Sequence, residues 1–304
     1  MTRNMINTFV FLDLESTGLP MYGNRVRVTE LCFVAVSRKS ILECSKNEDC
    51  IPRILKKLSF VVNPRAPIPD EVVQLTGLSN ENLEDESPFD QNKADMIKLF
   101  FQSCVPPMCM IAHNGIRFDF PLLKKELAAF NQAIPADLLC ADSMPGFKRV
   151  NIEQNDTTLS PIIDQTDVML FDAVSRIEQC ISQEANETTP MAQLITTPGC
   201  SNGKMATPTP PSPQLAAKIV PANFGNVKRK LFVDGDRGEQ SNKLKLNYSL
   251  NHVYLSLFSR SIANAHRAES DTIALLQCCV KMGSPLLEYF DSEAKKFEDV
   301  IAMR

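Results

Sequence analysis

The chain has 304 residues, of which 44% are hydrophobic, and its formal net charge is −4 at neutral pH. This length and apolar content suffice for a packed core in one large or two small domains, as in a soluble globular protein. The acidic balance excludes a broadly basic surface, so a nucleic acid would have to be held locally rather than by a global positive field.

Three strands are expected in the first 63 residues, because apolar and β-branched residues dominate the segments 9–14, 25–37 and 58–63. Turn-like connections between them predict an antiparallel meander. The pattern then becomes helical, and we expect these elements before residue 150: helical turns at 70–75 and 80–83, a helix over 92–104, a buried strand at 108–112, a helix that begins near 121 and a strand at 138–142.

The segment 151–245 contains few aromatic residues and clusters of Thr, Ser, Pro, Gln and Asn. Such a composition cannot offset the entropy of ordering, so we interpret the segment as a largely disordered insertion, with a short amphipathic helix over 168–181. Order returns at Tyr248, and helices are expected over 250–258, 271–282 and 285–302. The sequence therefore predicts one α/β core in two parts, 1–150 and 246–304, interrupted once.

The N-terminal segment and the cysteines indicate the compartment. Residues 1–7 hold no long apolar run, and the apolar segment 9–14 is too short to serve as a signal sequence or to span a bilayer. Ten cysteines are scattered without a C-x-x-C pair, which indicates neither a zinc site nor a disulfide framework. We therefore expect reduced thiols in a protein of the cytoplasm, the nucleus or both, neither secreted nor anchored by a transmembrane segment.

The first predicted strand carries two carboxylates near its end, Asp13 and Glu15. Since side chains alternate across a strand, both point to the same side, where two like charges require a cation, a basic partner or solvent. A turn that begins at Asp13 and leads to Thr17 and Gly18 explains the same residues without a metal. On this segment alone the two interpretations are equally good.

Two further acids stand near the starts of predicted helices, Asp119 and Asp271. Together with Asp13 and Glu15 they could hold two Mg²⁺ ions about 3.5 to 4 Å apart, the arrangement that stabilises the attacking and leaving oxygens in phosphodiester displacement. Each acid also has a structural explanation, since Asp119 can cap its helix and Asp271 can complement the helix dipole.

His266 precedes Asp271 by five residues, which would place the two side chains about 140° apart on a continuous helix. Both can reach one site only if His266 lies on the loop before the helix, with Ser270 as the N-cap. The imidazole could then deprotonate an attacking water, although a solvated loop position is the simpler alternative.

Three segments resemble, in this order, the exonuclease motifs of the DEDDh, or DnaQ-like, 3′→5′ exonucleases: DLESTGLP (13–20), AHNGIRFDFPLL (112–123) and HRAESD (266–271). The similarity is greatest to the TREX family of DNA exonucleases. It extends to VTELCFVAV, LTGLSNENLE, CADSMPGFK and NYSLNHVYLSLF, so it covers nearly all of 8–149 and 246–282. The resemblance implies an α/β fold with an RNase H-like mixed five-stranded sheet flanked by helices.

The same resemblance implies that Asp13, Glu15, Asp119 and Asp271 bind two Mg²⁺ ions, with Mn²⁺ as a substitute, and that His266 is the general base. Phe118 stands where the family can carry tyrosine, so it keeps the ring and lacks the hydroxyl. The residues implied to contact the 3′-terminal nucleotide are Glu15, Ser16, Thr17, Leu19, His113, Asn114, Phe118 and His266.

The activity expected from this resemblance is Mg²⁺-dependent 3′→5′ DNA exonuclease activity, which releases nucleoside monophosphates from single-stranded or frayed 3′ ends. An RNA exonuclease of the same class is one alternative, because the catalytic residues do not read the 2′-position. An inactive binding or scaffold protein on the same fold is another. A homodimer is compatible with the family, and the cations considered as phosphate contacts are Arg117, Lys124, Lys148 and Arg149.

Two short motifs lie in the insertion. Residues 207–213 (TPTPPSP) match a polyproline ligand of SH3 or WW domains and a run of proline-directed phosphorylation sites, although most such tracts are linkers. Residues 228–232 (KRKLF) resemble a nuclear signal and a cyclin-docking motif. A cyclin, a kinase or an SH3 or WW domain is therefore a candidate partner.

Overall fold

The computed structural model describes residues 5–20, 25–46, 50–130, 134–153 and 248–303. By its internal contacts the chain divides into two units, Met1–Ile177 with Leu244–Arg304 and Glu178–Lys243, and every described residue belongs to the first. The helix expected over 168–181 and the two insertion motifs lie outside the described residues.

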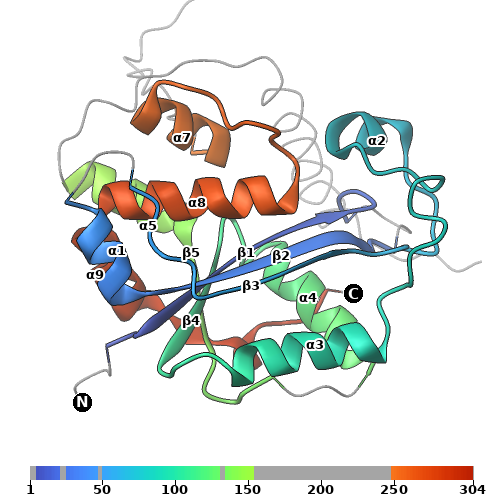
Figure 1. Cartoon of the computed structure of the whole chain (residues 1–304), viewed down its shortest axis with the longest axis horizontal. Coiled ribbons are helices and arrows are strands. Elements are labelled where there is room, and N and C mark those ends of the chain that lie inside the picture. Colours follow the sequence, from blue (N-terminus) through green and yellow to red (C-terminus); the bar gives the residue numbers. More distant parts are fainter. Residues whose placement is uncertain (1–4, 21–24, 47–49, 131–133, 154–247, 304) are drawn as a thin grey trace, which may run out of the picture. The chain divides into compact units, whose positions relative to one another are not determined.

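A mixed sheet forms the centre of the first unit, with the strand order β3-β2-β1-β4-β5-β6 (Figure 1). β1 pairs antiparallel with β2, and β2 with β3, which confirms the predicted meander. β4 is parallel to β1, and β5 is parallel to β4. The strands are β1 (Thr8–Ser16), β2 (Val28–Ser37), β3 (Lys56–Val61), β4 (Met108–Ala112), β5 (Leu139–Asp142) and β6 (Lys295–Lys296).

The sixth strand corrects two expectations. A five-stranded sheet and a terminal helix over 285–302 were expected, but the helix ends at Glu293, and Lys295 and Lys296 pair antiparallel with β5. The break occurs at Ala294, whose φ of −59° and ψ of 137° are extended. Because the helical pattern does not show where the backbone leaves the helix, the sequence overestimates its length.

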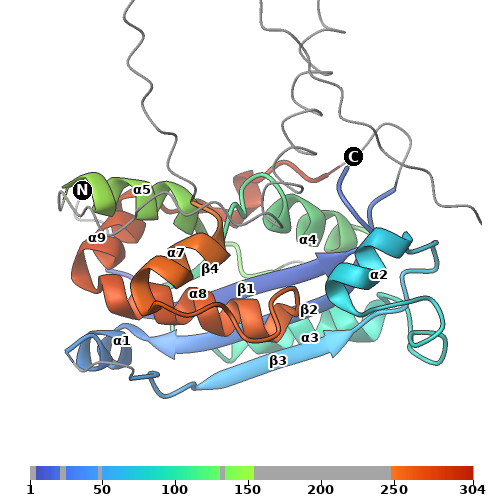
Figure 2. The same ribbon diagram turned by 90° about the horizontal axis from the view of Figure 1, so that it is seen from above.

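Helices cover both faces of the sheet (Figure 2). Along β1, Phe9 and Phe11 contribute to one apolar cluster, whereas Val10, Leu12 and Leu14 contribute to the other, as strand alternation requires. The first cluster lies under α1 (Arg38–Cys44), α5 (Ser143–Glu153), α7 (Leu250–Phe258), α8 (Ala268–Met282) and α9 (Ser284–Glu293), and the second under α3 (Gln91–Gln102) and α4 (Asp119–Ala128).

The remaining helix, α2 (Asp70–Thr76), ends at Gly77, whose φ of 75° lies in the left-handed region that favours glycine. Among the described residues, no helix is long and apolar enough to cross a membrane.

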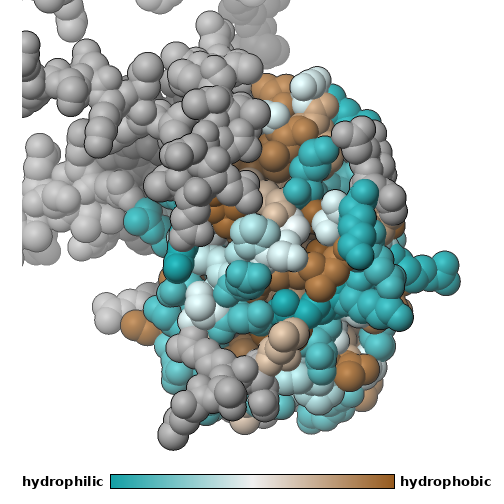
Figure 3. Space-filling model, turned by 90° about the vertical axis from the view of Figure 1, so that its left-hand side faces the viewer, coloured by the Kyte–Doolittle hydropathy of each residue, from teal (hydrophilic) through white to brown (hydrophobic). Residues whose placement is uncertain are grey.

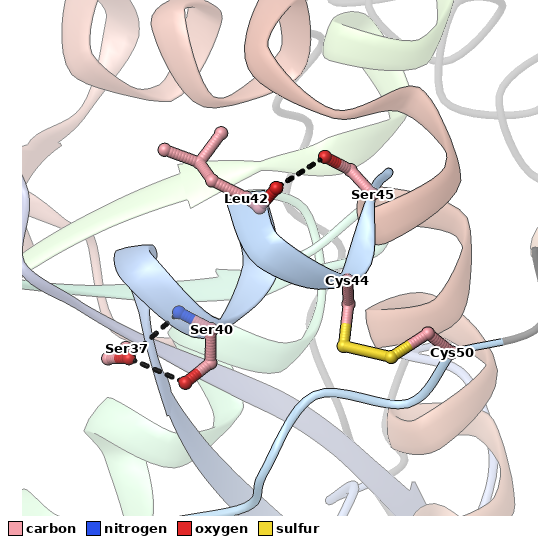
Figure 4. The surroundings of a disulfide bond; sticks show 6 residues. All are labelled: Ser37, Ser40, Leu42, Cys44, Ser45 and Cys50. Carbon is pink, nitrogen blue, oxygen red and sulfur yellow. Dashed lines mark hydrogen bonds between the residues drawn. A yellow bond between two sulfur atoms is a disulfide. The ribbon is translucent and has the colours of Figure 1, made fainter. Parts of the chain in front are cut away.

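Cys44 at the end of α1 forms a disulfide with Cys50, which corrects the expectation of fully reduced thiols (Figure 4). Their Cα atoms are 5.2 Å apart, within the range that a disulfide spans, because the chain turns back after α1. A separation of six residues is no recognisable motif, so the sequence did not indicate this pair. The free cysteines of the described part are buried: Cys32, Cys104, Cys109, Cys140, Cys278 and Cys279.

A cavity of about 550 Å³ opens near this disulfide, where β1 begins and β2 ends. Its lining includes Thr8, Arg38, Leu42 and Leu55. Figure 3 views the molecule from this side and shows hydrophobic residues interspersed among hydrophilic ones. Asp13 and Glu15 lie toward the other end of β1, so the cavity is separate from the predicted site.

Candidate active site

Asp13 and Glu15 lie on the part of β1 that extends beyond its pairing with β4. The parallel register with β4 ends at Phe11, whereas the antiparallel register with β2 continues to Ser16. By strand alternation both carboxylates lie on the same face as Phe11, the face that α8 covers. The pair therefore lies where β1 has no paired residue on the β4 side, on the face of the sheet that α8 covers.

His266 lies on the loop before α8, as the predicted site requires, with a left-handed φ of 63°. Its backbone amide donates to Oδ2 of Asp271 at 2.7 Å, which closes a turn that brings the two residues together. Ligand atoms of Glu15, His266 and Asp271 all lie within 4.8 Å of one another. Helix α8 begins at Ala268 with Arg267 as its N-cap, so the prediction of Ser270 as the cap was wrong by three residues.

Asp119 is the first residue of α4 and is 5% exposed. Phe118 holds the N-cap position, so Asp119 does not cap the helix. The backbone amides of Asp119 itself and of Leu14, which lies between Asp13 and Glu15, lower the pKa of this carboxylate against the larger effect of burial. The third predicted metal ligand thus lies beside the strand that carries the first two.

Burial, and after it the charges of neighbouring acids, raise the pKa of each of the four carboxylates. Burial raises the pKa of Asp13 well above its usual range, with further contributions from the charges of Asp271, Asp119 and Glu15. Burial first, and then the neighbouring acids, raise the pKa of Glu15 to about 8. Burial also raises the pKa values of Asp119 and Asp271 to about 7. A divalent cation would reverse these shifts, because it stabilises the ionised form of each carboxylate.

The donor set fits a hard divalent metal. Carboxylate oxygens are the ligands that Mg²⁺ and Mn²⁺ prefer, and an imidazole beside them is compatible with Mn²⁺. The residues that could hold such ions are Glu15 and Asp271, whose oxygens converge, together with Asp13 and Asp119, whose charges act on the same group.

Glu30 on β2 is a fifth acid that the sequence analysis did not assign to the site. It lies directly opposite Glu15 in the β1–β2 register. Its Oε2 accepts the backbone amide of Ala268 at 3.1 Å, and its charge raises the pKa of Asp13, Glu15 and Asp271. The sequence did contain a signal for this residue, because Glu30 is the one acid in the mostly apolar segment VTELCFVAV, on the strand that pairs with β1.

Asp142 at the end of β5 was also missed. It is 6% exposed, and its carboxylate accepts the backbone amides of Asn114 at 2.9 Å, Met144 at 3.0 Å and Ile116 at 3.2 Å. Asn114 has a φ of 57°, so the chain turns sharply here between β4 and α4. Asp142 therefore fixes the loop that delivers Asp119.

His113, predicted to contact substrate, is held by the protein at both ring nitrogens. Nε2 lies 2.8 Å from the carbonyl of Tyr248, and Nδ1 lies 2.9 Å from Oγ of Ser143. Burial lowers the pKa of His113 to about 4, so the ring is neutral at physiological pH. Because a carbonyl only accepts, Nε2 carries the proton and donates, and Nδ1 accepts from the Ser143 hydroxyl.

The other predicted substrate contacts lie around the exit of β1 and the start of α4. The Ser16 hydroxyl donates to the carbonyl of Gly18 at 2.8 Å, and Oγ1 of Thr17 accepts the amide of Arg27 at 3.1 Å. These bonds shape the turn that carries Leu19. Three of the predicted substrate contacts are partly buried without being enclosed: Leu19, Asn114 and Phe118.

Three of the cations considered as phosphate contacts are engaged within the protein. Lys124 donates to the carbonyl of Val300 at 2.6 Å, and Arg149 pairs with Glu293 at 3.5 Å. Lys148 lies over the ring of Tyr248, 5.5 Å from its centroid. Arg117 is exposed, two residues before Asp119.

Comparison with known proteins supports an exonuclease. A family model described as Exonuclease (RNase T) matches residues 10–165. Three prime repair exonuclease 2 of Homo sapiens is 36% identical over 146 residues, which are 46% of this chain and 61% of that protein. Three-prime repair exonuclease 1 of Bos taurus is 27% identical over 307 residues, 98% of this chain and 70% of that protein.

Among solved structures, E. coli Exonuclease I in complex with a dT13 oligonucleotide aligns with a TM-score of 0.41 and 16% identity, over 52% of this chain and 32% of that chain. The alignment with three prime repair exonuclease 2 of Homo sapiens spans less than two thirds of that protein's length. The family model covers just over half of the 304 residues and includes Asp13, Glu15 and Asp119. The chain belongs to the Exonuclease (RNase T) family, and its resemblance to the DnaQ-like and TREX exonucleases is thereby confirmed.

Proposed function

We propose that this protein is a 3′→5′ exodeoxyribonuclease that hydrolyses the terminal phosphodiester bond of a DNA 3′ end and releases nucleoside monophosphates. The observation that carries the proposal is the convergence of Glu15, His266 and Asp271 within 4.8 Å. Glu15 lies on β1, whereas His266 on the loop before α8 and Asp271 in the first turn of α8 follow about 250 residues later, and Asp13 and Asp119 act on the same group electrostatically.

The four carboxylates of Asp13, Glu15, Asp119 and Asp271 are the proposed metal ligands, and Mg²⁺ or Mn²⁺ is the proposed cofactor. Two divalent ions bound there would stabilise the charge on the attacking and leaving oxygens of the phosphodiester. Backbone amides orient Asp271, which accepts from His266, and the neighbouring Glu30, which accepts from Ala268.

His266 is the proposed general base, which would take a proton from the attacking water. Its backbone is fixed by the hydrogen bond from its amide to the carboxylate of Asp271, while its ring is only partly buried beside Glu15. A positioned base of this kind contributes about 10² to 10⁴ in rate.

Substrate recognition is proposed to rest on stacking rather than on base-edge contacts. Leu19 after β1 and Phe118 at the N-cap of α4 each offer partly exposed apolar surface. Contacts of this type are worth about 1 to 3 kcal/mol per base and tolerate any sequence, which suits single-stranded ends. The relatives are named three prime repair exonucleases, which agrees with a 3′ terminus as the substrate. The homodimer stays a prediction.

The test uses the full chain with 3′-terminal deoxynucleotides labelled on single-stranded DNA, in Mg²⁺, Mn²⁺ or EDTA. We expect stepwise release of mononucleotides with either metal and none with EDTA. Asp13→Ala and Asp271→Asn should each lower the rate by about 10³-fold or more, because each removes a metal ligand. Unchanged activity in both variants would refute the metal assignment.

A matched single-stranded RNA separates the alternatives. Faster cleavage of RNA than of DNA would indicate an RNA exonuclease. Binding of DNA without turnover in either metal would indicate a binding protein on an exonuclease fold.

A further inference from the structure

Glu30 contacts the start of α8 from the opposite strand of the β1–β2 hairpin. We propose that Glu30 is a positioning residue, which holds the first turn of α8 against β2 so that His266 and Asp271 face Glu15. The inference rests on the proposed function and assigns a role to a residue outside the predicted ligand set.

The register places Glu30 directly opposite Glu15, and the pairing shifts immediately afterwards, between Glu15 and Ser16. Directly opposed side chains have Cβ atoms about 4.5 to 5.5 Å apart, and two like charges at that distance destabilise a sheet. An acid at this position therefore costs stability unless its carboxylate makes a compensating contact.

That contact is the hydrogen bond from the backbone amide of Ala268 to Oε2 of Glu30, at 3.1 Å. Ala268 is the first residue of α8 and is fully buried, so water cannot serve as a ready replacement for the acceptor. The N-cap residue, Arg267, makes no side-chain hydrogen bond to the helix. Glu30 thus supplies from β2 the acceptor that an N-cap side chain ordinarily provides.

Ala268 lies between the two residues that the site needs. His266 precedes it by two positions, and Asp271 follows by three and accepts the His266 amide at 2.7 Å. Fixing Ala268 therefore fixes both ends of this turn relative to β2, and through the hairpin relative to Glu15 on β1.

Glu30 acts through the helix rather than as a ligand. The group of ligand atoms within 4.8 Å consists of Glu15, His266 and Asp271, and it does not include Glu30. The ion pair of Lys57 with Glu269, at 2.8 Å, also connects the first turn of α8 to the sheet, but both side chains are about half exposed. This pair offers a matched control, because an exposed ion pair contributes little.

Three substitutions separate the hydrogen bond from the charge. Glu30→Gln keeps the length and a carbonyl acceptor but removes the charge, whereas Glu30→Asp keeps the charge but falls one methylene short of Ala268. Glu30→Ala removes both, and Lys57→Gln is the control, because it breaks the exposed ion pair from β3 to Glu269 in the same turn of α8. Each full-length variant is compared with the wild type for kcat and KM on single-stranded DNA, and for hydrogen exchange of the peptide that spans residues 262–271.

We expect Lys57→Gln to stay within about 3-fold of the wild type in kcat. Glu30→Gln retains the acceptor but loses the charge beside the acidic cluster, so it should lower kcat less than Glu30→Ala does. Glu30→Ala and Glu30→Asp should lower kcat by about 10- to 100-fold with little change in KM, the loss that corresponds to one hydrogen bond to a charged acceptor. In the same two variants, amide exchange near Ala268 should accelerate by about 10-fold or more.

Two results would overturn the proposal: wild-type kcat and exchange in Glu30→Ala, or a defect in Glu30→Gln with none in Glu30→Asp, which would assign the effect to charge. If the wild type releases no nucleotides, the proposed function fails, but the exchange rates still decide the role of Glu30. Slow amide exchange near Ala268 in the wild type and Glu30→Gln, together with fast exchange in Glu30→Ala and Glu30→Asp, would support the positioning role of Glu30 independently of activity.

Discussion

Replacement of Asp142 by alanine should destabilise the protein strongly and impair the site without touching any predicted metal ligand. The buried carboxylate accepts three backbone amides, from Asn114, Ile116 and Met144. A hydrogen bond to a charged acceptor contributes about 1.5 to 3 kcal/mol, and water entering the vacated space recovers part of that. We therefore expect Asp142→Ala to lower the free energy of unfolding by about 3 to 5 kcal/mol.

Asp142→Asn refines this prediction. Its carbonyl oxygen can keep the amides of Asn114 and Met144, which share Oδ1, but its NH₂ group would face the Ile116 amide, donor against donor. The expected loss is about 2 kcal/mol, between wild type and alanine. Because the same loop delivers Asp119, nucleotide release should fall in the same order.

The assay is urea unfolding of the full chain, with exonuclease rate measured below the transition. Lys39→Ala serves as the control, because Lys39 forms an exposed ion pair with Glu43 at 3.7 Å, and such pairs contribute little. A loss below about 1 kcal/mol for Asp142→Ala would refute the reasoning, since three buried amides would then have found other acceptors.

Two further predictions concern pH and the insertion. In EDTA, the free energy of unfolding should fall by about 3 kcal/mol between pH 6.5 and 8.5. The raised pKa values of Glu15, Asp119 and Asp271 make the folded state bind more protons than the unfolded state in this range. The stabilisation from these bound protons is lost as the pH rises through about 7 to 8. His113 is about half protonated at pH 6.5 in the unfolded state and neutral in the folded state, which offsets only about 0.4 kcal/mol of this loss. Thermal unfolding with and without Mg²⁺ should show the loss only without metal, and a pH-independent melting temperature in EDTA would contradict it. Replacing residues 154–246 by a Gly-Ser linker of about eight residues should keep the melting temperature within about 3 °C, since the Asn151 amide donates to the Tyr248 hydroxyl at 3.2 Å and the two ends already lie together. Unfolding of that variant at 25 °C would show that the core requires the insertion.

Local patterns predicted most of the elements and singled out the acids and the histidine of the candidate site. Alternating and apolar segments identified β1, β2 and β4, and helical periodicity identified α7 at its observed bounds, Leu250–Phe258. The condition that His266 precede its helix was met: α8 begins at Ala268, and the left-handed φ at His266 and the hydrogen bond from its amide to Asp271 keep His266 outside the helix.

The features that sequence could not provide depend on contacts between distant segments. Glu30 meets Ala268 across 238 residues, and Asp142 meets Asn114 across 28. Both contacts depend on strand register and order, which no local period encodes. The same holds for His113, whose partner Tyr248 lies 135 residues away and whose environment keeps it neutral.

The hydrogen bonding around the acidic cluster suits the proposed metal site. The carboxylate of Asp271 accepts the amide of His266, and the amide of Leu14 lowers the pKa of Asp119. A backbone amide orients a carboxylate but brings no net positive charge, so the burial and the neighbouring acids that raise these pKa values act unopposed by a cation in the protein alone. The fold thus fixes the direction of the oxygens and leaves their charge uncompensated, which favours binding of a small divalent cation over closure of the cluster by lysine or arginine.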